Sequence, residues 1–375
     1  AELTQDVLDK YAPDVVADLN SAVWDAIRVN GKLYGIPLQQ IYVRQTGIRF
    51  NTELLNKYGF DPSTVKTLDD LDEYAATIKA NEPDAVVIYN YGHLIYENMV
   101  NYLGYDVIVS NTTPGVVYYA AETPVVFNQF ESEEFKALCE KMREWNLAGY
   151  FPTDAVTGAD SVGENDIRAI DTDPAHKPGG DTEGQLRGYD ITGIAFGDCA
   201  MTTGAVQATI TAVSATSKNV ERAVAFINLL DSDPEVLNLI CHGIEGTDYE
   251  FVGDKADGLI KPISDYPGML SFLVGNVFNE YYTDASQVGT WPETAEINAN
   301  AQASCILGFA FDSEPVATQI AQCSAVVEEY LPALNCGAVD VDSTLEAFNA
   351  ALKDAGVEQI IAEMQSQIDA WLATK

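Results

Sequence analysis

Polar and aromatic side chains crowd one short stretch of the chain, QQIYVRQ at residues 39–45. A sugar presents an apolar face bounded by hydroxyl groups, so a site for it needs aromatic planes together with amide, guanidinium or carboxylate groups at the rim. Gln39, Tyr42, Arg44 and Gln45 supply such groups within one segment. The stretch therefore predicts part of a binding site for a polar solute.

Further side chains of the same kinds recur along the chain, where aromatic residues make up 10% of the sequence. Trp291 stands between Gly289-Thr290 and Pro292, outside any helical or alternating apolar pattern, so we expect it in a loop with its ring free to stack on a sugar. The alternative for every aromatic residue is burial in a core. The remaining candidate ligand-binding residues are Tyr91, Tyr119, Lys177, Thr203, Gln207, Asn276 and Phe278.

Catalytic motifs are missing from the sequence. It contains no G-x-S-x-G, G-x-x-x-x-G-K-[ST], H-E-x-x-H or G-x-G-x-x-G pattern. His93 and Glu97 are spaced like half of a metal site, but an ordinary hydrogen-bonded histidine is the favoured interpretation. Among 57 acidic residues, a pair of carboxylates at glycosidase separation is expected by chance. We therefore predict no catalytic residue, no metal site and no cofactor.

The elements around residues 39–45 predict how the stretch is positioned. Asn30-Gly31 favours a turn, and the strand that follows it must end at Pro37, which lacks the N–H that a sheet ladder requires. Residues 41–50 alternate as a strand, Asn51 can cap a helix, and Gly59 can end that helix. The polar stretch should therefore lie where the chain passes from one sheet to another.

The rest of the chain alternates helices with strands. Apolar periodicity predicts helices at 3–11, 14–29, 67–80, 133–145 and 357–372 and helices starting near 219 and 234; it also predicts a buried strand at 86–91 and a loop-rich region at 151–188. Residues 204–214 alternate like a second crossing strand. Two crossings favour two interleaved lobes, the first formed by residues 1–44 and 207–265 and the second by 45–206 and 266–375.

Composition limits the class of protein. The chain has 375 residues, 47% of them hydrophobic, which suffices for two domains, and a net charge of −37 that excludes nucleic acid as a partner. No apolar run is long enough for a membrane span, and the start lacks the features of a signal peptide. The six cysteines show no C-x-x-C spacing, so we expect mostly free, buried thiols, with disulfides left open for an exported protein.

Three blocks of sequence resemble the extracellular solute-binding proteins of ABC importers, family 1, and specifically the Gram-positive lipoprotein branch with a helical C-terminal extension. The blocks are GKLYGIPLQQIYVRQTGIRFNTELLNKYGF; TTGAVQATITAVSATSKNVERAVAFINLLDSDPE with GIEGTDYE; and ILGFAFDSEPVATQIAQCSAVVEEYLPAL with AGVEQIIAEMQSQIDAWLA. They span most of the chain in the order of the family. Members of the family begin with a lipoprotein signal and βα units that do not precede Ala1, so we expect lobe one to be incomplete here.

The resemblance implies an α/β two-lobe fold of the periplasmic-binding-protein type II class with a helical C-terminal region. It implies a protein that is not an enzyme, captures a carbohydrate such as an oligosaccharide, and delivers it to the permease subunits of an ABC transporter. The location implied is extracellular, on the cell surface, with a lipid anchor on the missing N-terminal part; we expect a monomer. The alternatives are a protein that binds a peptide or another small polar solute and, less favoured, a glycan-active enzyme.

Overall fold

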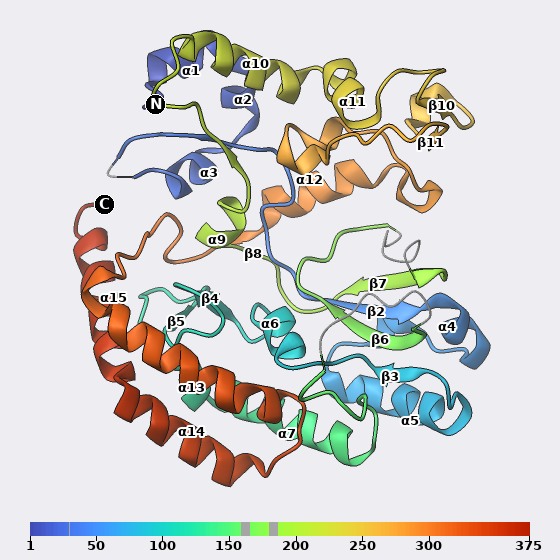
Figure 1. The fold of residues 1–375 in the computed structure, drawn as a ribbon, viewed down its shortest axis with the longest axis vertical. Coiled ribbons are helices and arrows are strands. Elements are labelled where there is room, and N and C mark those ends of the chain that lie inside the picture. Colours follow the sequence, from blue (N-terminus) through green and yellow to red (C-terminus); the bar gives the residue numbers. More distant parts are fainter. Residues whose placement is uncertain (30, 159–165, 180–186) are drawn as a thin grey trace.

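Two separate buried cores organise the chain in the computed structural model, which describes residues 1–29, 31–158, 166–179 and 187–375. One core collects side chains from residues 3–43 and 201–227 together with Leu307, and the other from residues 48–196 and, apart from Leu307, 306–368. We call the parts around them lobe one and lobe two; in Figure 1 lobe one lies above lobe two. The predicted α/β fold with two interleaved lobes and a helical C-terminal region is confirmed.

Lobe two is built on a four-stranded sheet of order β3-β6-β2-β7. Strand β2 pairs antiparallel with β6 and β7, and β3 runs parallel to β6. The strands are β2 (Gly47–Asn51), β3 (Val86–Ile88), β6 (Arg168–Asp173) and β7 (Ile191–Ala195), and the hairpin β4 (Tyr105–Val107) and β5 (Val116–Tyr118) lies apart from them. Because β2 directly follows the crossing at residues 43–47, the centre of the sheet is tied to lobe one.

Helix ends in lobe two follow the capping signals of the sequence. Asn51 accepts a hydrogen bond from the Leu54 N–H, and Gly59 ends the helix with φ +65°. Thr67 and Asp70 form the predicted capping box, which opens a 3₁₀ turn before the next helix. The helices are α4 (Thr52–Tyr58), α5 (Asp72–Asn81), α6 (Leu94–Met99) and α7 (Glu133–Leu147). Strand β6 was missed, because it lies in the region predicted to be loop-rich.

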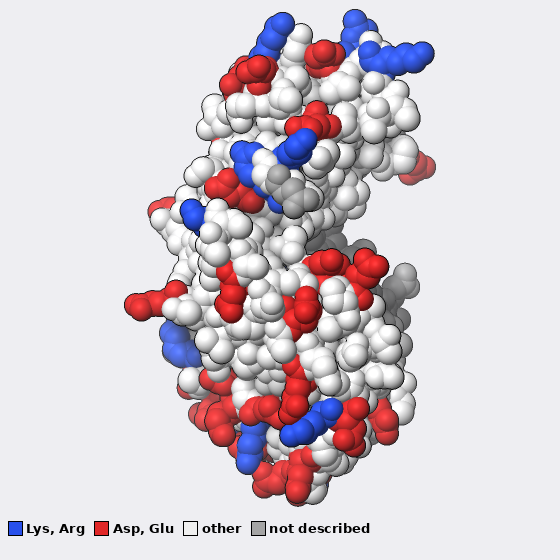
Figure 2. Space-filling view, turned by 90° about the vertical axis from the view of Figure 1, so that its left-hand side faces the viewer, with Lys and Arg blue, Asp and Glu red and all other residues white. Residues whose placement is uncertain are grey.

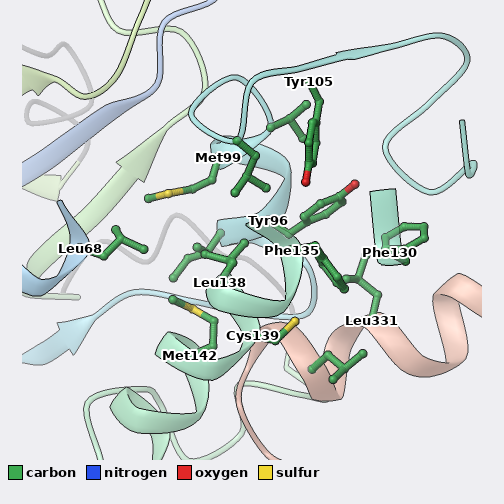
Figure 3. Packing of buried hydrophobic residues seen from close by; sticks show 14 of the residues in the cluster. Leu68, Tyr96, Met99, Tyr105, Phe130, Phe135, Leu138, Cys139, Met142 and Leu331 are labelled. Carbon is green, nitrogen blue, oxygen red and sulfur yellow. The ribbon is translucent and has the colours of Figure 1, made fainter. Parts of the chain in front are cut away.

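The C-terminal helices α13 (Ala317–Asn335), α14 (Val341–Ala355) and α15 (Val357–Leu372) complete the core of lobe two. Figure 3 shows Leu331 of α13 beside Phe135 of α7, whose ring meets that of Tyr96 edge-on at 5.4 Å. Asn335, at the end of α13, exchanges hydrogen bonds with Asn90 and accepts one from the Tyr96 N–H. The helical extension is therefore an integral part of lobe two.

Lobe one is mostly helical in the part of the chain that the structure describes. Its helices are α1 (Gln5–Tyr11), α2 (Pro13–Asp18), α3 (Ser21–Ala26), α9 (Thr203–Val206), α10 (Val220–Ser232), α11 (Pro234–His242) and α12 (Thr290–Asn300). Its strands are β1 (Ile36–Pro37) with β9 (Ile210–Thr211), and β10 (Tyr249–Phe251) with β11 (Ile260–Pro262). The helix predicted at 14–29 is divided, because Asn20 caps α3 by accepting from the Val23 N–H.

The lobes are joined where extended segments cross between them. The backbones of Arg44 and Ala200 exchange two hydrogen bonds, of 2.7 and 2.9 Å, and β8 (Ala200–Met201) pairs in parallel with β12 (Gln302–Ala303). The crossing strand predicted at 204–214 is instead α9 followed by β9. The Thr202 hydroxyl causes this difference, because it accepts from the Ala205 N–H and so caps a helix.

The predicted lobe boundaries differ from the buried cores at two points. Met201 and Val206, which precede the predicted border at 207, belong to the core of lobe one. Ile297 of α12, within the segment 266–375 that was assigned to lobe two, also packs against the core of lobe one. We therefore propose that residues 1–43 and 199–304 form lobe one.

The outer surface carries the acidic excess of the sequence. Figure 2 shows acidic side chains scattered over lobe two and an indentation between the lobes at one edge. All six cysteines are free thiols, four of them buried. Among the helices of the described residues, none is long and apolar enough to cross a membrane.

Candidate functional site

A polar cavity of about 540 Å³ lies between the two lobes. Lobe one contributes the N-terminal end of α9, lobe two contributes α6, β4 and the loops that follow them, and Arg44 enters from the crossing segment. The lining residues are Arg44, Glu97, Asn98, Val100, Asn101, Tyr105, Asp106, Val107, Val109, Ser110, Asn111, Pro174, Thr202, Gly204 and Ala205. Because both lobes form its walls, a rigid-body movement of the lobes would change the size of the cavity.

The Arg44 guanidinium is the cation of this cavity. Its backbone is fixed by the bonds to Ala200, which turn its side chain into the cavity. Among the described residues, none forms a hydrogen bond or an ion pair with the guanidinium. Burial lowers the pKa of Arg44, and the charge of Asp173 acts in the opposite direction. An arginine remains charged nonetheless, so its N–H donors are available to a ligand.

Two asparagine amides in the cavity are oriented by the protein itself. The Asn98 Nδ2 donates to the Thr172 hydroxyl at 2.8 Å, and the Asn101 Nδ2 donates to the Arg44 carbonyl oxygen at 2.6 Å. No described residue donates to the Oδ1 atom of either side chain. These fixed amide groups can accept hydrogen bonds from hydroxyl groups.

Asp106 adds a desolvated carboxyl group to the wall of the cavity. Its side chain is 3% exposed, and among the described residues its Oδ2 atom has no hydrogen-bond partner. Burial raises the pKa of Asp106 to about 6, against the lowering effect of the Ser304 hydroxyl. Together with Arg44 and the asparagines, Asp106 gives the cavity both donors and acceptors, which suits a polar ligand rich in hydroxyl groups.

A smaller hollow of about 360 Å³ lies on the other side of the crossing segment. It is lined by Gln45, Cys199, Glu293, Glu296, Ile297, Asn300 and Ala301, most of them on α12. Successive side chains of an extended segment point to opposite faces, which explains why Arg44 and its neighbour Gln45 line different hollows. The sequence prediction had grouped the two side chains at one site.

Trp291 lies in the first turn of α12, whereas the sequence predicted a loop. Its Nε1 donates to the Glu280 carbonyl oxygen at 3.2 Å, and its ring stacks on Tyr282 with centroids 6.1 Å apart. Phe278 meets the ring edge-on at 5.9 Å, and the Lys177 Nζ lies 5.4 Å from the ring centroid. The predicted residues Lys177, Phe278 and Trp291 are thus brought together, but apart from the cavity that Arg44 lines.

Several other predicted residues have partners within one lobe. Gln39 is buried and donates to Asp231 at 2.8 Å. Tyr42 belongs to the core of lobe one, and Asn276 caps a 3₁₀ turn by accepting from the Phe278 N–H. We interpret these contacts as structural, because the side chains are already engaged in hydrogen bonds or core packing within the lobe and are not available to a ligand.

The last predicted residues lie in different parts of the molecule. Tyr119 is buried, the Tyr91 hydroxyl donates to Asp154 at 3.4 Å, and the Gln207 Nε2 donates to the Ala26 carbonyl oxygen. Thr203 stands between Thr202 and Gly204 of the cavity wall, and its hydroxyl accepts from the Gly308 N–H. Of the predicted set, Arg44 lines the cavity and Thr203 adjoins it.

Sequence reasoning missed Asn98, Asn101 and Asp106. They occur in the run YENMVNYLGYD, where amide and carboxylate side chains alternate with apolar ones. Polar residues at this spacing in an otherwise buried segment are the feature of the sequence that could have indicated these three residues.

A polar cavity enclosed by two lobes, with extended segments joining the lobes, is the arrangement typical of two-lobe solute-binding proteins. Comparisons with known proteins agree with this class. The chain is 29% identical over 387 residues to a carbohydrate ABC transporter substrate-binding protein of Streptococcus pneumoniae serotype 4, covering 100% of this chain and 76% of that protein. A family model described as a domain of unknown function, DUF3502, matches residues 305–373.

The solved structures include a relative of similar identity. The N-glycan transport solute binding protein (NgtS) of Streptococcus pneumoniae matches with a TM-score of 0.86 and 26% identity, covering 100% of this chain and 82% of that one. The same protein in complex with Man1GlcNAc matches with a TM-score of 0.78, again at 26% identity and covering 100% of this chain and 83% of that one. By sequence and by fold, the chain is similar to substrate-binding proteins of ABC transporters.

Proposed function

We propose that this protein captures an oligosaccharide in the cavity between its lobes and delivers it to the permease of an ABC importer. One observation carries the proposal: the half-buried Arg44 guanidinium, which has no partner among the described residues, lies in a cavity that both lobes form. Leaving a cation desolvated and unpaired costs free energy, which a ligand that accepts its hydrogen bonds recovers.

The comparisons support a carbohydrate ligand. NgtS, which is 26% identical, has been crystallised with Man1GlcNAc and with Man5GlcNAc. Mannose and N-acetylglucosamine units carry hydroxyl and amide groups and no charge, which suits a cavity that mixes donors from Arg44 with acceptors from Asn98 and Asn101. We therefore infer a neutral, N-glycan-type oligosaccharide.

The ligand enters between open lobes, which then close on it. Arg44 and Thr202 would hold it from the side of lobe one and the crossing segment, and Asn98 and Asn101 from lobe two. We place no ligand contact at the group formed by Lys177, Phe278 and Trp291, because none of the three lines this cavity. Delivery to a permease requires that the protein lie at the outer cell surface. We propose that it is held there by a lipid anchor, as a monomer.

A ligand screen tests this proposal. Calorimetry and thermal unfolding with Man1GlcNAc, Man5GlcNAc, other oligosaccharides and peptides should give binding and a raised Tm with glycans, because a ligand that binds only the folded state stabilises it by mass action. Binding of peptides and of no glycan would replace the proposal with its alternative, a peptide-binding protein. Shortened glycans after long incubation would instead indicate an enzyme.

A further inference from the structure

A contact between the lobes lies on the side of the crossing segment away from the Arg44 cavity. Lys177 follows β6 of lobe two, and Trp291 begins α12 of lobe one. The Lys177 Nζ lies 5.4 Å from the centroid of the Trp291 ring, within the range of a cation–π interaction. Two segments assigned to different lobes therefore attract each other here.

Gly179 reinforces this contact sterically. A Cβ atom on Gly179 would lie 2.7 Å from Thr290 Cγ2 and 3.2 Å from the Ser286 carbonyl oxygen, and the φ of Gly179 is +92°. Only glycine fits this approach of the two backbones without displacement. The loop is also held at its base, because the His176 N–H donates to the Gln45 carbonyl oxygen at 2.9 Å. We call Lys177, Gly179, Thr290 and Trp291 the latch.

The latch and the Arg44 cavity lie on opposite faces of the crossing segment. Gln45 and α12 line the smaller hollow on the latch side, while Arg44 faces the cavity. In Figure 1, most of α12 lies to the right of the crossing, and α9 and β4 lie to its left. Pro174, directly after β6, lines the cavity, whereas Lys177 three residues later reaches Trp291. A rotation about the crossing that narrows one side must widen or shear the other.

We propose that the latch holds the lobes in the open arrangement and that closure on a ligand breaks it. This inference rests on the proposed function, since it assumes that the cavity closes on the ligand. Each state is then stabilised by a different contact, the open state by the latch and the closed state by the ligand. The latch thereby sets ligand affinity from residues that never touch the ligand, because the free energy of breaking it is subtracted from the binding free energy.

Substitution of either partner tests the proposal. Lys177→Met and Trp291→Leu should each bind Man5GlcNAc about two- to fivefold more tightly than the unaltered protein, because the open state loses one cation–π contact. The double variant should gain little beyond either single variant, since both substitutions remove the same contact. Lys10→Met is the matched control, because Lys10 makes its cation–π contact with Tyr11 within lobe one and should leave affinity unchanged.

A reversible cross-link gives the opposite perturbation. Gly179→Cys combined with Thr290→Cys places two sulfur atoms at the contact, and oxidation should fix the open state and lower the affinity for Man5GlcNAc at least tenfold relative to the reduced pair. Reduction should bring the affinity to that of the unaltered protein or above it, because the side chain that Gly179→Cys introduces, without the disulfide, crowds the contact and weakens the latch. Unchanged affinity of the oxidised pair would overturn the latch. Weaker binding by Trp291→Leu would overturn it as well and would assign the ring to the ligand instead.

A measurement without ligand separates this inference from the proposed function. Small-angle scattering of the ligand-free Lys177→Met/Trp291→Leu double variant should give a smaller radius of gyration than the oxidised cysteine pair, because the lobes are then free to close. If the unaltered protein binds no glycan, the proposed function fails while this comparison still decides on the latch. Equal radii would contradict it.

Discussion

Arg44 and Gln45 are neighbours in sequence, but their side chains lie on opposite faces of the segment that joins the lobes. Arg44 lines the interlobe cavity, and Gln45 lines the smaller hollow beside α12. The Gln45 Nε2 donates to the Gly197 carbonyl oxygen at 3.2 Å, whereas the Arg44 guanidinium has no partner among the described residues. Adjacent residues thus differ: the Arg44 guanidinium has hydrogen-bond donors available to a ligand, whereas the Gln45 amide already has a partner within the protein.

The first prediction compares these two residues. Arg44→Met should weaken glycan binding by roughly ten- to a hundredfold, because a hydrogen bond to a charged group typically contributes about 1.5–3 kcal/mol. Gln45→Ala should change affinity by less than twofold in the same calorimetric titration. Equal losses in the two variants would show that the cavity is not the binding site.

The second prediction concerns the shape of the protein. Saturating glycan should reduce the radius of gyration measured by solution scattering, because both lobes contact the ligand and must approach each other. A peptide that does not bind serves as the control. An unchanged radius with a bound glycan would mean that the lobes are already closed.

The third prediction is a fall in stability from pH 5 to pH 8. Burial raises the pKa of Asp231 to about 7, with Asp18 and Asp14 acting in the same direction and Gln39 against it. A carboxyl group with a raised folded-state pKa stabilises the fold fully below its unfolded value and loses that contribution as the pH rises through about 7. The loss between pH 5 and pH 8 should be roughly 2–3 kcal/mol.

Asp231→Asn provides the control for this effect. An amide does not titrate, so the Tm difference between pH 5 and pH 8 should shrink in the variant, as measured by thermal unfolding at the two pH values. Burial also raises the pKa of Asp106, to about 6, which acts on stability in the same direction. The Asp231→Asn variant should therefore retain a smaller dependence of Tm on pH. The same Tm difference in the variant as in the unaltered protein would assign the pH effect to other groups.

The fourth prediction concerns the attachment of the C-terminal helices. Asn335 is 2% exposed, and its amide bonds to Asn90, to the Tyr96 N–H and to the Gly92 carbonyl oxygen. Asn335→Ala should therefore lower the free energy of unfolding by about 2–4 kcal/mol, because buried partners lose their hydrogen bonds. Asn81→Ala, on an exposed helix surface, should cost less than about 0.5 kcal/mol in the same denaturant titration.

Local signals in the sequence predicted the helices of lobe two well. Asn51, Gly59 and the Thr67–Asp70 box act within one turn of the chain, so their effect does not depend on the rest of the fold. The family resemblance supplied the two-lobe architecture. The helical C-terminal region was predicted in the same way.

The site was harder to predict, because it depends on contacts between distant segments. Residues 204–214 alternate like a strand, but the Thr202 cap starts α9 there and moves the crossing to residues 196–200. Asn98 and Asn101 enter the cavity because Thr172 and the Arg44 backbone orient their amides, and no local pattern encodes those partners. Trp291 was placed in a loop because Pro292 was interpreted as a stiff turn, although proline is tolerated in the first turn of a helix.

The core of lobe two combines residues 48–196 with α13–α15, which follow all of lobe one in the sequence. Phe348 and Ile360, both fully buried, join this core after all of lobe one has been made. A growing chain thus cannot close the core of lobe two before its final helix emerges from the ribosome. Contacts of such long sequence separation form slowly, so lobe two should remain incompletely folded until α15 has been made, with the aromatic surface around Phe130 open to chaperones.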